Sequence, residues 1–155
     1  MLLEPYHRNL GKRLVKSPKL YMADTGLAAF LMGFESGEGL LRHTVIGALW
    51  ETHVVMQIVK HFASKGKTVP LWFWRTGQGA EVDLLVEHGG RFFAIEAVFS
   101  EAPDETALKG LDALQKFRGE DCLIAGYIAS RTQRSYPLSD KVLAAPGSFI
   151  DPFLE

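Results

Sequence analysis

The sequence lacks the features that small disulfide-stabilised or membrane-bound proteins rely on. Cys122 is the only cysteine among 155 residues, so neither an intrachain disulfide nor a cysteine-based zinc site is available. Apolar runs such as Leu71–Trp74 are far too short to cross a bilayer. The first residues include Glu4 and Pro5 in place of a secretory signal. We therefore expect a protein without membrane association, located in a reducing cytoplasm.

An excess of charge of one sign is also absent. The chain has 17 Lys and Arg against 18 Asp and Glu residues, and its pI is near 6.5. A dedicated DNA-binding domain usually carries a strong basic excess. Basic side chains are nevertheless concentrated in residues 1–19, where five stand against one acid. This arm could contact nucleic-acid phosphates, although a solvated loop is the simpler interpretation.

Length and composition fit one globular domain of ordinary size, with 47% hydrophobic residues. Residues 1–43 are expected to form a small N-terminal unit. Its predicted elements are strands over 2–6 and 19–22, a helix over 27–32 that Asp24 or Thr25 caps, and a loop over 33–43.

Residues 44–155 are expected to form the main domain. The predicted elements are a helix over 44–64, strands over 69–75, 80–87 and 91–99, a helix over 104–117, a strand over 122–129, an edge strand over 141–145 and a tail over 149–154. The strand over 69–75 is apolar on both faces, which predicts a central position in the sheet. The fold class is therefore α/β, a mixed central sheet with helices on both faces, preceded by a short β-hairpin and helix.

Two carboxylates in neighbouring strands could lie opposite each other. The segment His88–Gly90 favours a two-residue type I′ turn, which pairs His88 with Arg91 and places Asp83 opposite Glu96. Opposed side chains share a face, with Cβ atoms about 4.5–5.5 Å apart. Two carboxylates there repel each other unless one is protonated, water reaches both or a cation lies between them. A slip of one residue would separate them.

A third acid lies on the apolar face of the long helix. Glu51 shares that face with Val54, Val55, Ile58 and Phe62. An unpaired buried glutamate is costly, so Glu51 requires a partner. Glu51, Asp83 and Glu96 together would suit Mg²⁺ or Mn²⁺, which could orient water for attack on a phosphodiester. The simpler alternative is that strand 80–87 turns its acids to solvent.

Several motifs along the chain resemble a known family. They are Glu4-Pro5-Tyr6, Asn9, Lys12-Arg13, Lys19-Leu20-Tyr21, Asp24-Thr25-Gly26-Leu27, Gly47, Glu51, Val54, Trp74-Arg75, Glu81-Val82-Asp83 and Ile95-Glu96. Together they resemble the uncharacterised domain that lies C-terminal to the AAA-type P-loop module in many bacterial and archaeal ATPases. That domain is similar to the PD-(D/E)XK restriction-endonuclease-like superfamily. The resemblance implies an αβββαβ core, with residues 1–25 as the end of a winged-helix-like segment in a fragment or truncated copy. The chain has no GxxxxGK[ST] loop of its own.

The resemblance also implies roles for particular residues. Glu51 matches the helix acid, Asp83 the metal-binding aspartate and Glu96 the acid of the E-x-K element. The lysine expected two positions after Glu96 is Val98, which cannot position water or offset charge. Lys109 on the next helix could substitute for it, or could be an ordinary solvated lysine.

Three functions are consistent with these features. The first is a catalytically degenerate, nuclease-like accessory domain of an AAA-type ATPase, which binds nucleic acid or a protein partner. The second is an active Mg²⁺-dependent nuclease that uses Glu51, Asp83, Glu96 and Lys109 as catalytic residues. The third is a purely structural interaction domain whose acids are vestigial.

Overall fold

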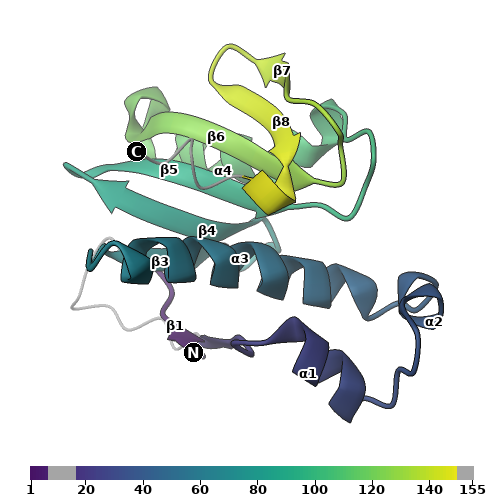
Figure 1. Ribbon diagram of the computed structural model, residues 1–155. Coiled ribbons are helices and arrows are strands. Elements are labelled where there is room, and N and C mark those ends of the chain that lie inside the picture. The colour runs from purple at the N-terminus through teal and green to yellow at the C-terminus, as the bar shows by residue number, and fades with distance from the viewer. Residues whose placement is uncertain (7–16, 150–155) are drawn as a thin grey trace.

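The computed structural model describes residues 1–6 and 17–149. In Figure 1 a sheet forms the upper layer, the long helix α3 runs beneath it, and the N-terminal segment lies beneath α3. Most of the basic arm (Arg8, Lys12, Arg13 and Lys16) lies outside the described residues, as do residues 150–154 of the tail expected over 149–154.

From residue 44 onward the predicted helices and strands occur in the predicted order, with β7 (Tyr136–Ser139) as an additional strand. The N-terminal segment contains β1 (Leu2–Leu3), β2 (Lys19–Leu20), α1 (Thr25–Leu31) and α2 (Gly37–Leu41). The main domain contains α3 (Ile46–Ser64), β3 (Leu71–Arg75), β4 (Glu81–His88), β5 (Arg91–Ala97), α4 (Lys109–Arg118), β6 (Leu123–Ser130), β7 (Tyr136–Ser139) and β8 (Val142–Pro146). Short 3-10 turns lie at Glu105–Leu108, Glu120–Cys122 and Gly147–Phe149. The predicted α/β class with a leading hairpin and helix is confirmed.

The six-stranded sheet is mixed, in the order β3-β4-β5-β6-β8-β7. Strands β3, β4 and β5 are antiparallel, β6 and β8 continue in parallel, and β7 is antiparallel to β8. Helix α3 packs on one face, where it buries Val54, Val55, Ile58 and Phe62. Helix α4 packs on the other face through Leu111 and Leu114. Each helix buries one apolar stripe, so the two faces of the sheet have separate cores.

The position predicted for residues 69–75 is wrong, because β3 is an edge strand. Its outer edge is covered by the start of the chain. The N–H of Phe73 donates to Glu4 O at 3.1 Å, and the N–H of Tyr6 donates to Phe73 O at 2.6 Å. The ring of Tyr6 also packs edge-on against Trp72. A covered edge is buried like a central strand, so the apolar pattern could not distinguish the two.

Two further expectations are corrected at the periphery. The strand predicted over 141–145 exists as β8, but the outermost strand is β7, which the sequence analysis did not find. Residues 33–43 are not all loop, since α2 forms there and the Ser36 hydroxyl accepts a hydrogen bond from Gly39 N–H. Asp24 caps α1 as predicted, by accepting from Leu27 N–H at 2.9 Å. Short capped turns have too little periodicity to be recognised in a glycine-rich segment.

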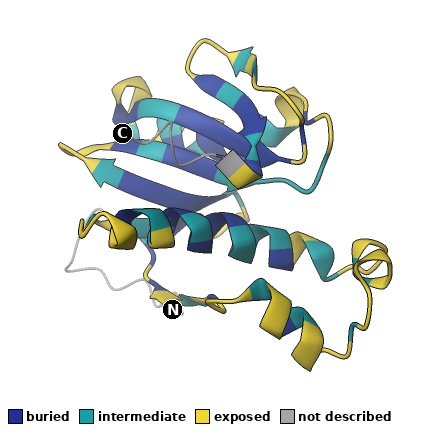
Figure 2. Cartoon of the chain, in the orientation of Figure 1, coloured by how far each residue is buried: buried dark blue, intermediate teal, exposed yellow. Residues whose placement is uncertain are grey.

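Burial separates the main domain from the N-terminal segment. Figure 2 shows the buried residues gathered in the sheet and along α3, whereas α1 is largely exposed. Among the residues of α1 only Ala28 is buried. None of the described helices is long and apolar enough to cross a membrane.

Candidate functional site

The side-chain amine of Lys19 lies at the centre of three carboxylates. Its Nζ atom is 2.7 Å from Glu51 Oε1, 2.5 Å from Glu81 Oε1 and 3.1 Å from Asp83 Oδ1. These residues come from β2, α3 and β4, so the cluster joins the N-terminal segment to both layers of the main domain. All four side chains are largely buried, from 11% exposed for Asp83 to 24% for Glu51. We call Lys19, Glu51, Glu81 and Asp83 the ion cluster.

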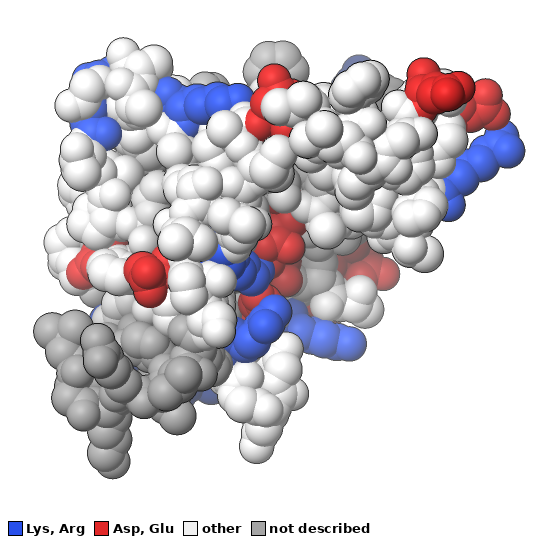
Figure 3. Space-filling view, turned by 90° about the horizontal axis from the view of Figure 1, so that it is seen from below, with Lys and Arg blue, Asp and Glu red and all other residues white. Residues whose placement is uncertain are grey.

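Two more side chains, outside the four that define the ion cluster, form hydrogen bonds with it. The Tyr21 hydroxyl donates a 2.6 Å hydrogen bond to Glu51 Oε1. The Arg75 guanidinium donates to the second oxygen of Glu81, with Nε at 2.7 Å. The sequence analysis did not connect Lys19, Tyr21 or Glu81 with the site. Figure 3, turned to the underside of the molecule, shows acidic and basic side chains meeting near the middle of that face.

A β-bulge directs Asp83 into the ion cluster. Trp72 pairs with Leu85, but Trp74 pairs with Val82, so two residues of β4 oppose Phe73 alone. Such an extra residue turns neighbouring side chains away from strict alternation. Val82 and Leu85 both lie in the core on the α4 face, while Asp83 contacts Lys19 on the α3 face.

The hairpin register is as predicted through most of its length. Gly89 and Gly90 both have positive φ, as a type I′ turn requires, and the pairs run from His88–Arg91 to Leu84–Ile95. Beyond these pairs the expectation that Asp83 and Glu96 share a face is wrong. A Cβ atom placed on Gly110 of α4 would lie 3.3 Å from Glu96 Oε2, so Glu96 faces α4. The bulge at Asp83 is the reason for the difference.

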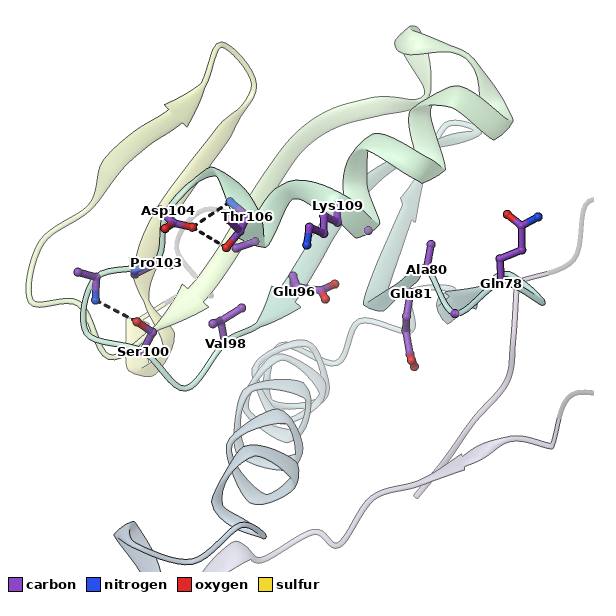
Figure 4. Close-up of a pocket in the computed structure, with 14 residues that line it drawn as sticks. Gln78, Ala80, Glu81, Glu96, Val98, Ser100, Pro103, Asp104, Thr106 and Lys109 are labelled. Atoms are coloured by element: carbon purple, nitrogen blue, oxygen red, sulfur yellow. Dashed lines mark hydrogen bonds between the residues drawn. The ribbon is translucent and has the colours of Figure 1, made fainter.

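Glu96 lines a pocket of about 830 Å³ between the start of β4, the end of β5 and the start of α4, and Glu81 of the ion cluster lines it as well. Lys109 and Val98 also line it, whereas Glu51 and Asp83 do not. Figure 4 shows the Lys109 side chain reaching toward Glu96, while Glu81 points away from Lys109. The Glu96 Oε2 atom is buried and has no hydrogen-bond partner within the described ranges. The four predicted catalytic residues therefore lie at two places. Glu51 and Asp83 meet at Lys19, whereas Glu96 and Lys109 line the pocket beside α4.

The electrostatics of the ion cluster favour a charged lysine. Burial disfavours the ammonium, but the attraction of Asp83, Glu51 and Glu81 outweighs it and raises the pKa of Lys19. Burial also raises the pKa of Asp83, and the charge of Glu51 adds to this effect. For Glu81 the contacts with Lys19 and Arg75 outweigh burial and lower the pKa.

The surroundings of Glu96 also shift its pKa strongly. Burial, followed by the negative charges of Asp83 and Glu81, raises the pKa of Glu96 to about 9. A carboxyl group with this pKa is protonated at neutral pH and carries a hydrogen that it can donate. A metal ion could bind this carboxyl group only with release of that proton.

The metal site implied by the resemblance does not fit this arrangement. Glu51 and Asp83 meet, but the ammonium of Lys19 lies between them, and Glu96 faces the opposite side of the sheet. With the Lys19 amine in contact with Glu51, Glu81 and Asp83, no group of three or more acidic, histidine or cysteine side chains in the part of the chain that the structure describes could hold a metal ion. We therefore derive no chemical step through Mg²⁺ or Mn²⁺.

Comparison with known proteins places the chain in a family of unknown function. Residues 46–149 match the model described as "Domain of unknown function (DUF4143)", so the chain belongs to that family. Residues 1–38 match a second model, "Domain of unknown function (DUF8612)".

Two curated relatives come from mycobacteria. The uncharacterized proteins Rv2008c of Mycobacterium tuberculosis (strain ATCC 25618 / H37Rv) and Mb2031c of Mycobacterium bovis (strain ATCC BAA-935 / AF2122/97) are each 37% identical over 150 residues. The match covers 96% of this chain and 32% of each relative, so the chain spans about a third of their length. No solved structure matches it.

Proposed function

We propose that this chain is an accessory domain of an AAA-type ATPase, nuclease-like in origin and catalytically degenerate, whose role is to dock on a protein partner. The observation that carries the proposal is an exposed apolar surface on the N-terminal segment. Of the ten large hydrophobic side chains that are exposed among the described residues, nine lie between positions 1 and 41. We call this set the N-terminal apolar surface: Met1, Leu2, Leu20, Met22, Leu27, Phe30, Leu31, Met32 and Leu41.

The centre of this surface is α1. Residues 25–34 contain no charged side chain, yet Phe30 is 73% exposed and Leu31 is 68% exposed. Single exposed apolar residues are ordinary, but a group of them on adjacent elements is typical of an interaction site. The neighbouring strands β1 and β2 have only two residues each. A hairpin of that size is marginal in isolation and gains stability when a partner packs on it.

The length of the relatives supports a protein partner within a larger assembly. About two thirds of each mycobacterial relative lies outside the matched region. The resemblance implies an AAA-type P-loop module in that part, and such a module would supply the apolar face that covers α1. In this proposal the ATPase performs the chemistry and the present domain provides an attachment surface.

Three features of the site support the proposed catalytic degeneracy. Val98 occupies the position of the motif lysine. The carboxylates of Glu51 and Asp83 both contact the amine of Lys19, which takes the position between them. Lys109 shares a pocket with Glu96 but not with Asp83. Hydrolysis of a phosphodiester needs these groups around one reacting phosphate, and the fold separates them.

A direct binding measurement tests the docking role. The part of the M. tuberculosis relative outside the matched region is produced separately and titrated calorimetrically into the 155-residue chain. We expect saturable binding that is lost in the double variant Phe30→Asp/Leu31→Asp. Phe117→Asp is the matched control, since Phe117 is 51% exposed on α4, outside the N-terminal apolar surface. Absence of binding, or equal loss in the control, would contradict the proposal.

A further inference from the structure

We propose that Lys19 is a built-in cation that occupies the place a divalent metal ion would take between Glu51, Glu81 and Asp83. It thereby fastens the N-terminal hairpin to the α/β domain without metal. This inference rests only on the ion cluster, and it stands whether or not the domain docks on an ATPase.

The contacts of Lys19 match its bonding capacity. A lysine ammonium has three N–H donors and no acceptor. Its Nζ atom contacts three carboxylate oxygens, one from each acid, at 2.5 to 3.1 Å. The ammonium also lies 5.4 Å from the centre of the Phe73 ring, on the covered edge strand. Hydrogen bonds to Glu51 and Asp83 and the close ion pair with Glu81 thus hold the amine from three directions.

The charges around Lys19 indicate what would replace it. The three acids contribute −3 and the contacting Arg75 contributes +1, so without Lys19 the group carries a net charge of −2. This equals the charge that one divalent ion neutralises, and carboxylate oxygens are the ligands that Mg²⁺ and Mn²⁺ prefer. With Lys19 present the net charge is −1, and the central position is filled by the ammonium.

The consequence is a fixed junction between two parts of the chain. Lys19 lies within residues 1–38, which match the DUF8612 model, and the three acids lie within residues 46–149, which match the DUF4143 model. Strand β2 is only two residues long and pairs only with β1 in the sheet. Lys19 provides the polar contacts of β2 with α3 and β4. Its removal should weaken this junction and leave the three acids without the amine between them.

The test compares the effect of Mn²⁺ on the thermal unfolding of metal-stripped protein variants. For the wild type we expect no Mn²⁺-dependent rise in Tm. Lys19→Met keeps the aliphatic stem but removes the charge. It should unfold at lower temperature, and Mn²⁺ should raise its Tm in a saturable manner, since a ligand that binds only the folded state stabilises it. The Mn²⁺ effect should disappear in Lys19→Met/Asp83→Asn.

Three controls keep the test decisive. Lys19→Arg retains the charge and should behave like the wild type. Lys116→Met removes an exposed lysine of α4 and should change neither Tm nor the Mn²⁺ response. If Lys19→Met does not fold alone, Lys19→Met/Glu81→Gln has less repulsion and should still be stabilised by Mn²⁺. An Asp83-dependent Mn²⁺ effect in the wild type, or no effect in either Lys19→Met variant, would overturn the inference.

Discussion

The Asp83 carboxylate is held by two different parts of the protein. Its Oδ2 atom accepts a hydrogen bond from the backbone N–H of Ala97 at 2.9 Å, while its Oδ1 atom contacts the Lys19 amine at 3.1 Å. One oxygen therefore fastens β4 to the end of β5, and the other fastens it to the N-terminal hairpin. Since Asp83 as a whole residue is only 8% exposed, these contacts replace most of the hydration of its carboxylate.

Removal of the Asp83 carboxylate should destabilise the fold. Asp83→Ala leaves the Ala97 N–H without its acceptor and removes one of three acids from Lys19, so we expect a loss of about 2–4 kcal/mol in the free energy of unfolding. Asp112→Asn, an exposed change on α4, should have an effect below about 0.5 kcal/mol. Urea denaturation followed by circular dichroism measures both. Equal stability of Asp83→Ala and the wild type would show that the contacts of Asp83 are energetically unimportant.

The approach of α4 to β4 depends on Gly110. A Cβ atom at this position would lie 1.9 Å from the carbonyl oxygen of Glu81, a backbone atom that cannot move without displacing β4. Gly110→Ala should therefore cost about 1–3 kcal/mol through overpacking. Gly47→Ala in α3 is the matched control, because no atom lies within 4 Å of its added Cβ. The control should be neutral or stabilising by up to about 1 kcal/mol.

The raised pKa of Glu96 predicts a pH-dependent stability. The group has a higher pKa in the folded state than in the unfolded chain, so the folded state binds the proton more tightly. Its contribution to stability is fully present below the ordinary glutamate pKa of 4.5 and is lost as pH rises toward about 9. Glu96→Gln, which cannot ionise, should show a flatter decline across this range. Urea titrations of both proteins at a series of pH values measure the difference, and parallel curves would contradict the assignment.

Nuclease assays test the separation of the acids. The wild type should not cleave DNA or RNA in the presence of Mg²⁺ or Mn²⁺. Val98→Lys alone should also be inactive, because Asp83 and Glu96 still face opposite sides of the sheet. Cleavage by the wild type that is lost in Glu96→Gln would support an active nuclease. New cleavage by Val98→Lys would show that both acids reach one metal ion.

The sequence was informative where a local pattern has one physical solution. The Gly89–Gly90 turn fixed the hairpin register, because two consecutive positive φ values define a type I′ turn. The apolar spacing on α3 identified its buried face, and Glu51 at the end of that face was correctly expected to need a partner. Patterns of this kind depend on residues that are close together in the chain.

The sequence could not identify that partner. Lys19 lies 32 residues from Glu51 and 64 from Asp83, and no local rule relates these positions. The bulge opposite Phe73 could not be predicted from the sequence either. Apolar residues flank Asp83 in β4, and an apolar side chain can be buried on one face of the sheet as well as on the other, so the pattern does not show where alternation is interrupted. A single extra residue was enough to turn Asp83 away from Glu96.

The sequence by itself determined the α/β elements, the hairpin register and the presence of three acids in need of charge compensation. Only the tertiary structure decided that an amine provides this compensation, that Glu81 takes the place expected for Glu96, and that an apolar helix is left uncovered. The physical reason is that periodicity and turn chemistry act over a few residues, whereas electrostatic neutralisation of a buried group depends on whichever element the fold brings within contact distance.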